Sequence, residues 1–412
     1  MEYGLIGEKL GHSFSKEIHG KIGDYDYRLK ELAPDALSAF LTEGDFKGIN
    51  VTIPYKKDVI PYLYAISPEA EAIGAVNTVV NRAGKLYGYN TDYIGLKRLI
   101  LRITKGQPLA GKVLILGTGG TSLTANAVVK DMGATPVIVS RSGKDGAITY
   151  EEALRDHTDA SFLINTTPVG MYPRDDGMAV DPTAFPQLKG VADAVYNPLR
   201  TPLVRRAKGL GIPAEGGLYM LVAQAVAAYG FFFDTEADEA LTDRIYCEVQ
   251  TEKENIVLIG MPASGKSTVG KALAESLSRP FYDSDEEIVK EAGMPIPDFF
   301  AKCGEAAFRD LESRVIARLS SGLTGAVIAT GGGAVLRSEN VDRLKANGRL
   351  FWLDRSLEKL IPTSDRPLSS DREALTKRYE ERYPIYRASC DVRIDGDGAV
   401  EDVAEAMLRT FA

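Results

Sequence analysis

The feature that most constrains the fold of this chain is a glycine-rich loop, GMPASGKS, at residues 260–267. It follows the apolar run 256–259 and precedes a helix-like stretch over 268–277, so the pattern G-x-x-x-x-G-K-S lies between a strand and a helix. In that setting backbone N–H groups surround a phosphate chain, Lys266 contacts the outer phosphates and Ser267 ligates Mg²⁺. The loop therefore predicts a parallel α/β domain that binds ATP. The alternative is a plain glycine turn with a surface lysine.

An acidic cluster, FYDSD at 281–285, follows this helix where a second strand of the same sheet is expected to end. In open α/β sheets the carboxyl ends of the strands face one crevice, so Asp283 and Asp285 are expected beside the phosphate loop. One carboxylate can hold the Mg²⁺ shell while the other accepts a hydroxyl proton, as phosphoryl transfer requires. Taken alone, an Asp-x-Asp sequence after a strand is more often a solvated turn or a helix cap.

A second glycine loop, GTGGTS at 117–122, lies between the apolar run 113–116 and a predicted helix. Ser122 stands where G-x-G-x-x-G has its third small residue, so the motif alone is weak and a plain βα turn is the alternative. The next predicted strand ends at Ser140 and is followed by Arg141 rather than by an acidic residue. An arginine there favours a ribose 2′-phosphate, which predicts NADP rather than NAD.

Length and charge exclude several classes of protein. A chain of 412 residues exceeds what one hydrophobic core usually serves, so we expect several domains. Net charge is −8, and the residues before and after position 250 each contribute −4, which is not the basic footprint of a nucleic-acid-binding protein. Without an apolar run of membrane-spanning length or a secretory leader, we expect a cytoplasmic protein with no membrane partner. The formation of a homo-oligomer stays open.

Residues 254–412 contain six motifs in the order found in shikimate kinases. They are the phosphate loop, FYDSD at 281–285, FRDLE at 308–312, ATGGG at 329–333, RPL at 366–368 and RYPIY at 382–386. This part of the chain resembles that family throughout, which implies phosphorylation of shikimate on its 3-hydroxyl group by MgATP.

The kinase resemblance implies a role for each matching residue. A guanidinium fork suits a carboxylate, which supports an arginine pair for the substrate, and Glu312 is spaced to hold Arg309. The implied ATP-binding residues are Ala263, Ser264, Gly265, Lys266, Ser267, Thr268 and the lid residue Arg366, with Ser267 and Asp283 (through water) at Mg²⁺. The implied substrate-binding residues are Asp285, which is also the candidate base, Arg309, Gly331, Gly332, Gly333 and Arg382.

Residues 1 to about 245 contain a second ordered set of motifs, and these are similar to shikimate dehydrogenases. They are GHSFS at 11–15, NVTIPYKK at 50–57, GAVNT at 74–78, NTD at 90–92, NTTP at 165–168, YNP at 196–198 and GLYMLVAQ at 217–224. The resemblance implies substrate binding by Ser13, Ser15, Thr52, Lys56, Asn77, Asp92, Tyr196 and Gln224. It implies NADP binding by Gly117, Thr118, Gly119, Gly120, Thr121, Ser140, Arg141, Ser142, Lys144, Gly217 and Met220.

Lys56 and Asp92 are the catalytic dyad that this resemblance implies. Hydride delivery to a 3-keto carbon leaves an alkoxide-like oxygen, so a positioned ammonium can donate the proton while a neighbouring carboxylate keeps it charged. Lys57, the next residue, is expected to face solvent or the other side of the chain.

The two resemblances predict an α/β protein with three folded parts. An α/β substrate domain is expected at 1–103, with helices from 218–246 packing back on it, and a Rossmann NADP domain at 104–217. A linker is expected at 247–254, followed by a P-loop, nucleoside-monophosphate-kinase-like parallel-sheet domain at 255–412. The expected reactions are NADPH-dependent reduction of 3-dehydroshikimate and phosphorylation of the resulting shikimate.

Two other functions stay open at this point. One is a quinate/shikimate dehydrogenase fused to a different small-molecule kinase, and the other is an enzyme in which one half serves only as a binding module. Intact Lys56, Asp92, Lys266 and Asp285 disfavour the second, because a site without a reaction has no physical reason to keep all four.

Overall fold

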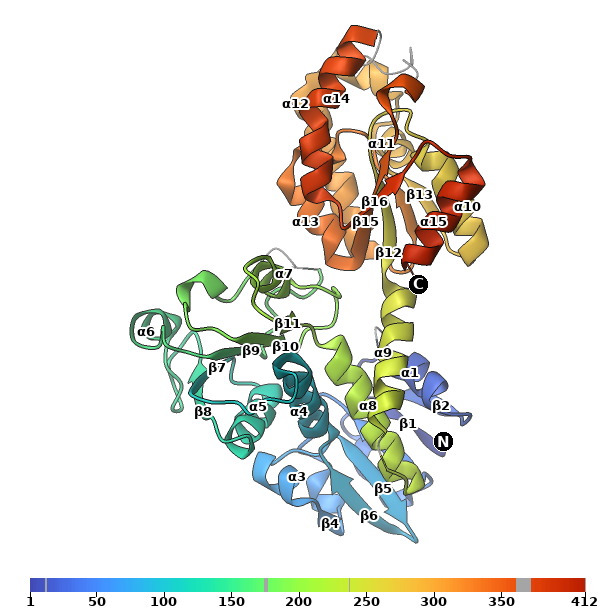
Figure 1. Cartoon of the computed structure of the whole chain (residues 1–412). Helices are drawn as coiled ribbons and strands as arrows, with labels where there is room; N and C mark the ends of the chain where they lie inside the picture. Colours follow the sequence, from blue (N-terminus) through green and yellow to red (C-terminus); the bar gives the residue numbers. More distant parts are fainter. Residues whose placement is uncertain (12, 174–176, 237, 361–371, 412) are drawn as a thin grey trace. The chain divides into compact units, whose positions relative to one another are not determined.

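The computed structural model describes residues 1–411 except 12, 174–176, 237 and 361–371 (Figure 1). The chain divides into two compact units, Met1–Val249 and Gln250–Ala412. The first unit contains two sheets and the second contains one, and helices flank each of them. The predicted α/β class is confirmed.

The first sheet has the strand order β2-β1-β3-β5-β6-β4 and is mixed. Strand β1 pairs in parallel with β2 and β3, whereas β5 pairs antiparallel with β3 and β6. Ala83 and Gly84 join β5 to β6 with φ of 53° and 82°, the positive values that a tight two-residue hairpin turn needs. The elements are β1 (Tyr3–Gly7), α1 (Ser15–Ile22), β2 (Tyr27–Glu31), α2 (Ala36–Glu43), β3 (Gly48–Val51), β4 (Ala65–Ile66), α3 (Pro68–Ile73), β5 (Thr78–Arg82), β6 (Lys85–Tyr89) and α4 (Thr91–Thr104).

The second sheet is wholly parallel, with the order β11-β10-β9-β7-β8. Strands β7 and β9 are apolar and buried on both faces, as expected of parallel strands covered by helices on each side. The elements are β7 (Lys112–Leu116), α5 (Gly120–Asp131), β8 (Thr135–Val139), α6 (Tyr150–Asp156), β9 (Phe162–Asn165), β10 (Gly190–Asp193), α7 (Pro202–Gly209) and β11 (Ala214–Glu215).

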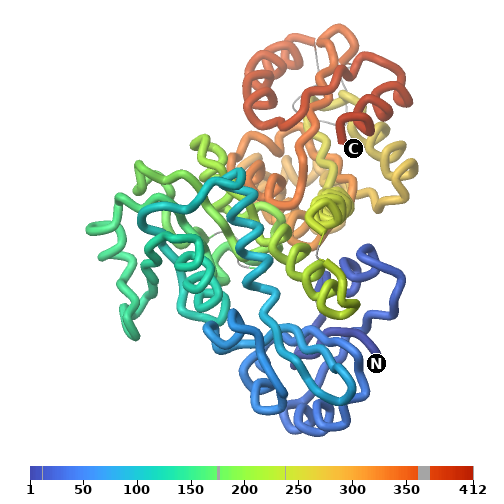
Figure 2. Tube along the Cα trace, turned by 60° about the horizontal axis from the view of Figure 1, so that its bottom comes forward, coloured from blue at the N-terminus to red at the C-terminus, as the bar shows by residue number. Residues whose placement is uncertain are grey.

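Helix α8 (Leu218–Phe233) is apolar around most of its circumference and is largely buried against α1 and α4. Figures 1 and 2 show α4 and α8 as neighbours within the first unit. The close approach depends on Gly95, because a Cβ there would lie 2.6 Å from the carbonyl oxygen of Met220. The packing of α8 against α4 places residues 218–224 beside the start of α4.

The segment 247–254, expected as a linker, is helical as far as Lys253. Helix α9 (Glu239–Lys253) continues through the boundary between the two units. Its apolar positions recur at helical spacing, so Thr242, Ile245, Tyr246 and Val249 are buried while charged residues occupy the other face. The stretch predicted as a linker is therefore the last part of a helix.

The sheet of the second unit is parallel, with the order β13-β14-β12-β15-β16. Gly304 interrupts the long helix α12 with a φ of 79°, which only glycine adopts readily. The elements are β12 (Asn255–Ile259), α10 (Lys266–Leu277), β13 (Phe281–Asp283), α11 (Ser284–Ala292), α12 (Ile296–Gly322), β14 (Val327–Ala329), α13 (Ser338–Asn347), β15 (Gly348–Asp354), α14 (Arg372–Ser389), β16 (Val392–Asp395) and α15 (Val400–Phe411).

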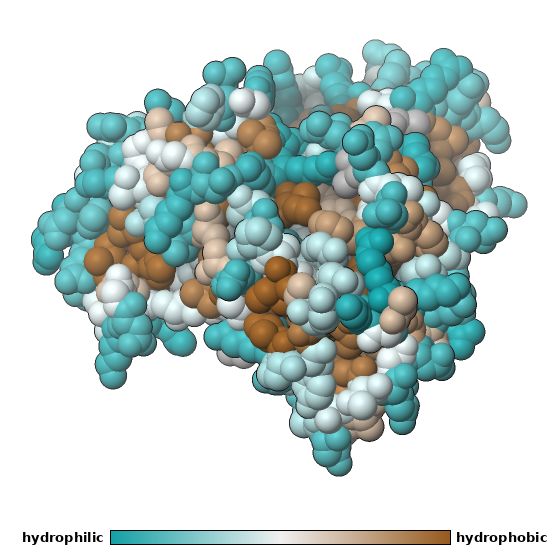
Figure 3. Space-filling view, turned by 90° about the horizontal axis from the view of Figure 1, so that it is seen from below, coloured by the Kyte–Doolittle hydropathy of each residue, from teal (hydrophilic) through white to brown (hydrophobic). Residues whose placement is uncertain are grey.

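The surface in Figure 3 is largely hydrophilic, and its hydrophobic residues form separate groups. Among the described residues, no helix combines the length and apolar composition that a membrane crossing needs. Cys247 and Cys303 are exposed and Cys390 is half-buried, and all three are free thiols.

Thr201 is expected to be a stabilising residue of the first unit. Its hydroxyl donates to the buried carboxylate of Asp193 (2.7 Å) and accepts from the backbone N–H of Val204 at the start of α7. Burial raises the pKa of Asp193 to about 6, and the hydrogen bonds that this carboxylate accepts, that of Thr201 first among them, oppose the rise. Replacing Thr201 with alanine removes both bonds and should cost about 2–4 kcal/mol of unfolding free energy.

Calorimetry should detect this loss as a fall of roughly 4–8 °C in the melting transition of the first unit. Ser67→Ala is the matched control, since Ser67 caps α3 without contacting a buried carboxylate, and it should cost about 1 kcal/mol. Equal effects of the two substitutions would contradict the importance assigned to the Thr201–Asp193 bond.

Candidate active sites

Lys56 and Asp92 form the centre of the site in the first unit. Lys56 follows β3 and Asp92 lies in the first turn of α4, and the Nζ atom donates to Oδ2 at 2.5 Å. The two side chains are 27% and 19% exposed, so the pair is partly shielded while remaining accessible to a ligand. Lys57, which was expected to face solvent or the other side of the chain, is exposed.

Asn77 is held beside this pair with a fixed amide orientation. Its Oδ1 accepts from the backbone N–H of Thr91 (2.6 Å), and the hydroxyls of Thr91 and Thr78 lie at 3.2 and 3.3 Å. The Thr91 hydroxyl also lies 3.3 Å from Oε1 of Gln224. Because the oxygen of Asn77 is engaged inside the protein, its amide N–H groups are the ones available to a ligand oxygen.

The other predicted substrate-binding residues lie near the start of α1 and after β3. The hydroxyls of Ser13 and Ser15 lie 3.0 Å apart at the start of α1, and Phe14 between them packs on Tyr196. Thr52 continues from β3 and donates its backbone N–H to Ile6. The structure therefore pairs Lys56 with Asp92 and links Asn77 to Gln224 through Thr91, the residue before Asp92, whereas Ser13 and Ser15 form a separate pair.

The loop after β7 has the shape that a dinucleotide phosphate needs. Gly117 has a φ of 116°, and a Cβ there would lie 2.8 Å from the Thr166 hydroxyl. Gly119 caps α5, and added Cβ atoms at Gly119 and Gly120 would meet open space. The helix N-terminus thus presents free space and N–H groups together, which fits a pyrophosphate.

Two groups of the other predicted NADP-binding residues lie after β8 and at the start of α8. Arg141, Ser142 and Lys144 are exposed after β8, and the buried Ser140 hydroxyl accepts from the Gly143 N–H. Gly217 begins α8, where a Cβ would lie 2.2 Å from the carbonyl oxygen of Ala194, so no other residue fits without rearrangement.

The phosphate loop of the second unit joins β12 to α10 as predicted. Gly260 and Gly265 have φ of 147° and 92°, which glycine adopts without the steric cost of a side chain. The Lys266 ammonium donates to the carbonyl oxygens of Gly260 (2.9 Å) and Met261 (2.7 Å), so it is held within the loop. These residues fit the phosphate chain of ATP.

Asp283 and Asp285 have different surroundings. Asp283 accepts from the Ser267 hydroxyl at 2.5 Å and caps α11 by accepting from the N–H of Asp285 at 2.9 Å. Asp285 points to Gly331, where an added Cβ would lie 2.5 Å from its Oδ1. The pair of Ser267 and Asp283 fits a water-coordinated Mg²⁺, and Asp285 is the carboxylate that faces the cavity.

The described residues contain no cluster of three or more histidine, cysteine, aspartate or glutamate side chains that could hold a metal ion alone. A Mg²⁺ ion at Ser267 would therefore take part of its coordination from phosphate oxygens and water, as nucleotide-bound Mg²⁺ usually does.

Arg309 lies against the glycine wall of the cavity. Its Nη1 atom donates to Glu312 at 2.7 Å and its Nη2 atom to Glu305 at 3.3 Å. Burial raises the pKa of Glu312, while the guanidinium of Arg309 opposes that rise. A Cβ at Gly333 would lie 2.2 Å from the Arg309 guanidinium, so glycine is needed for the arginine to reach the cavity.

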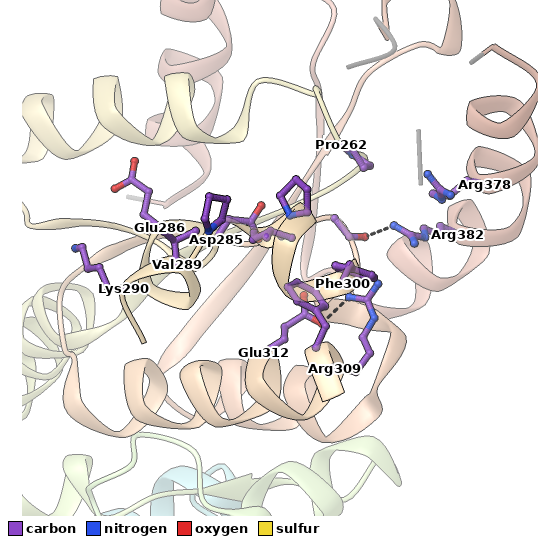
Figure 4. Close-up of a pocket in the computed structure, with 17 residues that line it drawn as sticks. Pro262, Asp285, Glu286, Val289, Lys290, Phe300, Arg309, Glu312, Arg378 and Arg382 are labelled. Carbon is purple, nitrogen blue, oxygen red and sulfur yellow. Dashed lines mark hydrogen bonds and ion pairs between the residues drawn. The ribbon is translucent and has the colours of Figure 1, made fainter. Parts of the chain in front are cut away.

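Arg382 approaches the same cavity from α14. Its Nη1 atom donates to the carbonyl oxygen of Gly332 at 2.9 Å, and the Tyr386 hydroxyl donates to the same oxygen at 2.5 Å. The cavity has a volume of about 670 Å³, and Figure 4 shows Asp285 on one side with Arg309 and Arg382 on another. Asp285, Arg309 and Arg382 therefore face one space.

Sequence reasoning missed two features of these sites. Arg378 lines the cavity one helical turn before Arg382, but the sequence alone does not separate it from its cationic neighbour Lys377. Thr91 orients Asn77 and is fully buried, and only the three-dimensional contact identifies it. Arg366, the predicted lid residue, lies outside the described residues.

Comparisons with known proteins match both halves of the chain. Residues 5–79 match the family model described as the shikimate dehydrogenase substrate binding domain, and residues 262–412 match the model described as shikimate kinase. A shikimate dehydrogenase (NADP(+)) of Clostridium perfringens (strain 13 / Type A) is 37% identical over 273 residues, which cover 60% of this chain and 98% of that protein.

Solved structures agree with the first of these matches. A chorismate mutase/shikimate 5-dehydrogenase fusion protein from Clostridium acetobutylicum has a TM-score of 0.56 and 34% identity, covering 60% of this chain and 96% of that one. Shikimate 5-dehydrogenase from Thermus thermophilus in complex with NADP(H) and shikimate has a TM-score of 0.54 and 28% identity, covering 60% of this chain and 99% of that one.

Proposed function

Because the chain belongs to the shikimate dehydrogenase family and its residues 262–412 match the shikimate kinase family, we propose that it catalyses two consecutive reactions. The first is reduction of 3-dehydroshikimate to shikimate with NADPH, and the second is phosphorylation of shikimate to shikimate 3-phosphate with MgATP. Two built sites support this proposal: the Lys56–Asp92 pair in the first unit, and Asp285 facing Arg309 and Arg382 in the second.

In the first reaction Lys56 acts as the general acid. NADPH, when bound, supplies the hydride to the 3-keto carbon. The Lys56 ammonium donates a proton to the oxygen that gains charge, and Asp92 keeps the ammonium protonated and aimed. Asn77 and Gln224 bind ring hydroxyls beside the dyad, and Ser13 and Ser15 bind the carboxylate. Tyr196 and Thr52 complete the substrate site.

In the second reaction Asp285 accepts the proton of the 3-hydroxyl group. MgATP, when bound, supplies the phosphoryl group. Arg309 and Arg382 grip the substrate carboxylate, and the backbone of Gly331, Gly332 and Gly333 forms the wall against which the ring lies. Glu312 holds Arg309 by a bond of 2.7 Å, so the guanidinium is already oriented before the substrate arrives.

The functional domains follow from these roles. We assign 1–103, with the helices of 218–246, to the dehydrogenase substrate, 104–217 to NADP, and 255–412 to the kinase reaction. A cytoplasmic location, the lack of nucleic-acid and membrane partners, and a homo-oligomeric state stay predictions.

Assays of the whole chain with alternative substrates test this assignment. We expect reduction of NADP⁺ with shikimate to be much faster than with quinate or with NAD⁺, and MgATP consumption to require shikimate. A preference for quinate with NAD⁺, or kinase activity on an unrelated acceptor alone, would instead support the dehydrogenase fused to a different kinase.

Arg141 is expected to determine the choice of cofactor. It is exposed directly after β8, where a ribose 2′-phosphate would lie, so Arg141→Asp places a carboxylate against that phosphate. We expect the KM for NADPH to rise by about 10- to 100-fold, the scale of a lost charge-assisted hydrogen bond, with a smaller change for NADH. Steady-state kinetics with each cofactor measures the ratio.

Lys130→Asp is the matched control for this substitution, because it makes the same charge change at the exposed far end of α5. It should leave the cofactor preference unaltered. An unchanged NADPH to NADH preference in Arg141→Asp would exclude Arg141 as the discriminating residue and direct attention to Lys144.

A further inference from the structure

The kinase cavity contains one more arginine than the carboxylate pair of Arg309 and Arg382. Arg378 precedes Arg382 by one turn of α14 and lines the same cavity. Figure 4 shows Arg378 and Arg382 projecting from that helix on one side of the cavity, with Asp285 on the other. Lys377, adjacent in sequence, is exposed. Because of the orientation of α14, Arg378 lines the cavity and its neighbour Lys377 does not.

The charges around Arg378 favour an anionic ligand. Arg309 already bonds to Glu312 and Glu305, and Arg382 bonds to the Gly332 carbonyl oxygen. The pKa of Arg378 is lowered, first by burial and then by the positive charge of Arg382, while Glu381 and Glu305 oppose this fall. The described part of the cavity lining contains four cationic and three acidic side chains, so its net charge is positive and an anionic ligand is favoured there.

The cavity to which Arg378 belongs is the one assigned to the phosphate acceptor. Among the described residues, its lining includes Asp285, Arg309 and Arg382, but from the phosphate loop only Pro262. Lys266 and Ser267, which serve the nucleotide phosphates, are not part of that lining. An anion near Arg378 is thus better matched to the acceptor's carboxylate than to ATP.

We propose that Arg378 is a further substrate-binding residue of the kinase site, one that contacts the carboxylate of the acceptor beside Arg309 and Arg382 and sets the preference for a carboxylate over a neutral group. This inference rests on the proposed kinase function. The planar fork of arginine suits the role, since it donates two parallel hydrogen bonds to one carboxylate.

The test compares shikimate with its methyl ester, which keeps the ring hydroxyls and removes the charge. In the full chain, Arg378→Gln should raise the KM for shikimate by about 10- to 100-fold, with kcat and the KM for ATP within about threefold. The ratio of kcat/KM for acid over ester should fall by about tenfold or more. The acid to ester ratio of Arg378→Lys should lie between those of the wild type and Arg378→Gln, because lysine keeps the positive charge but lacks the planar guanidinium.

Lys377→Gln is the matched control, and it should leave the acid to ester ratio unchanged because its side chain is exposed. Trp352, the chain's single tryptophan, stacks on Tyr386, so its fluorescence during thermal unfolding reports whether each variant keeps the kinase fold. If Arg378→Gln does not fold, a lower acid to ester ratio in Arg378→Lys supports the proposal and an unchanged ratio overturns it.

The outcomes separate this inference from the function on which it rests. A wild-type chain that does not phosphorylate shikimate overturns the kinase function and the inference together. A wild-type chain that does, combined with an unchanged acid to ester ratio in a folded Arg378→Gln variant, overturns the inference alone. A raised KM for ATP with an unchanged ratio would also overturn it, by placing Arg378 at the nucleotide.

Discussion

Replacing Lys56 with alanine is expected to slow the reduction of 3-dehydroshikimate, lowering kcat by about 10²-fold or more, the scale of a lost general acid. The Nζ atom donates to Asp92 at 2.5 Å, and alanine removes the ammonium that would protonate the developing alkoxide. Asp92→Ala should have an effect of similar scale, because the ammonium loses the carboxylate that orients it. Oxidation of NADPH, followed by absorbance, measures both variants.

Lys57→Ala is the internal control for Lys56→Ala, since Lys57 is the next residue and is exposed. It should keep dehydrogenase activity within about twofold. Kinase activity with added shikimate should also stay within about twofold in Lys56→Ala and Asp92→Ala, because neither residue belongs to the second unit. Loss of both activities from a folded Lys56→Ala chain would show that the sites are not separate.

Replacing Asp285 with asparagine is expected to slow shikimate phosphorylation, lowering kcat by about 10²- to 10⁴-fold. Asparagine preserves the shape of the side chain but cannot accept the proton of the 3-hydroxyl group. The backbone N–H of residue 285 still donates to Asp283, so the start of α11 should be retained. A coupled assay for ADP with saturating shikimate and MgATP measures this loss.

Asp342→Asn provides the matched control, because it makes the same change at a position of α13 outside the kinase cavity. Its kinase activity should equal that of the wild type, and the dehydrogenase activity of Asp285→Asn should be normal. If Asp285→Asn retained more than about a tenth of the wild-type kcat, another group would have to serve as the base.

The local motifs were predictable because each one depends on residues that are close in sequence. The phosphate loop at 260–267 combines a strand, a positive-φ glycine and a helix start within a few residues, so its geometry follows from the sequence alone. The positive φ of Gly117 after β7 follows from the same kind of local motif. The roles of Gly331 and Gly333 needed the family resemblance, and the structure supplies their physical reason in Asp285 and Arg309.

Features that depend on tertiary contacts could not be predicted in this way. The stretch 247–253 is charged on one side and buried on the other, and only the packing of Tyr246 and Val249 shows that the helix continues. Arg378 and Lys377 are adjacent cations, and the orientation of α14 decides which of them reaches the cavity. In the sequence Thr91 looks like any residue at the start of a helix. Its role becomes visible only in the structure, where it contacts Asn77.

The most direct test of the central claim is one incubation of the purified chain with 3-dehydroshikimate, NADPH and MgATP, with phosphorus NMR to identify the product. The account predicts shikimate 3-phosphate, formed with one NADPH oxidised and one ATP consumed per molecule. A mixture of the Lys56→Ala and Asp285→Asn chains should restore the product that neither forms alone. Oxidation of NADPH without any phosphorylated product, although shikimate accumulates beside MgATP, would contradict the claim that this chain performs both reactions.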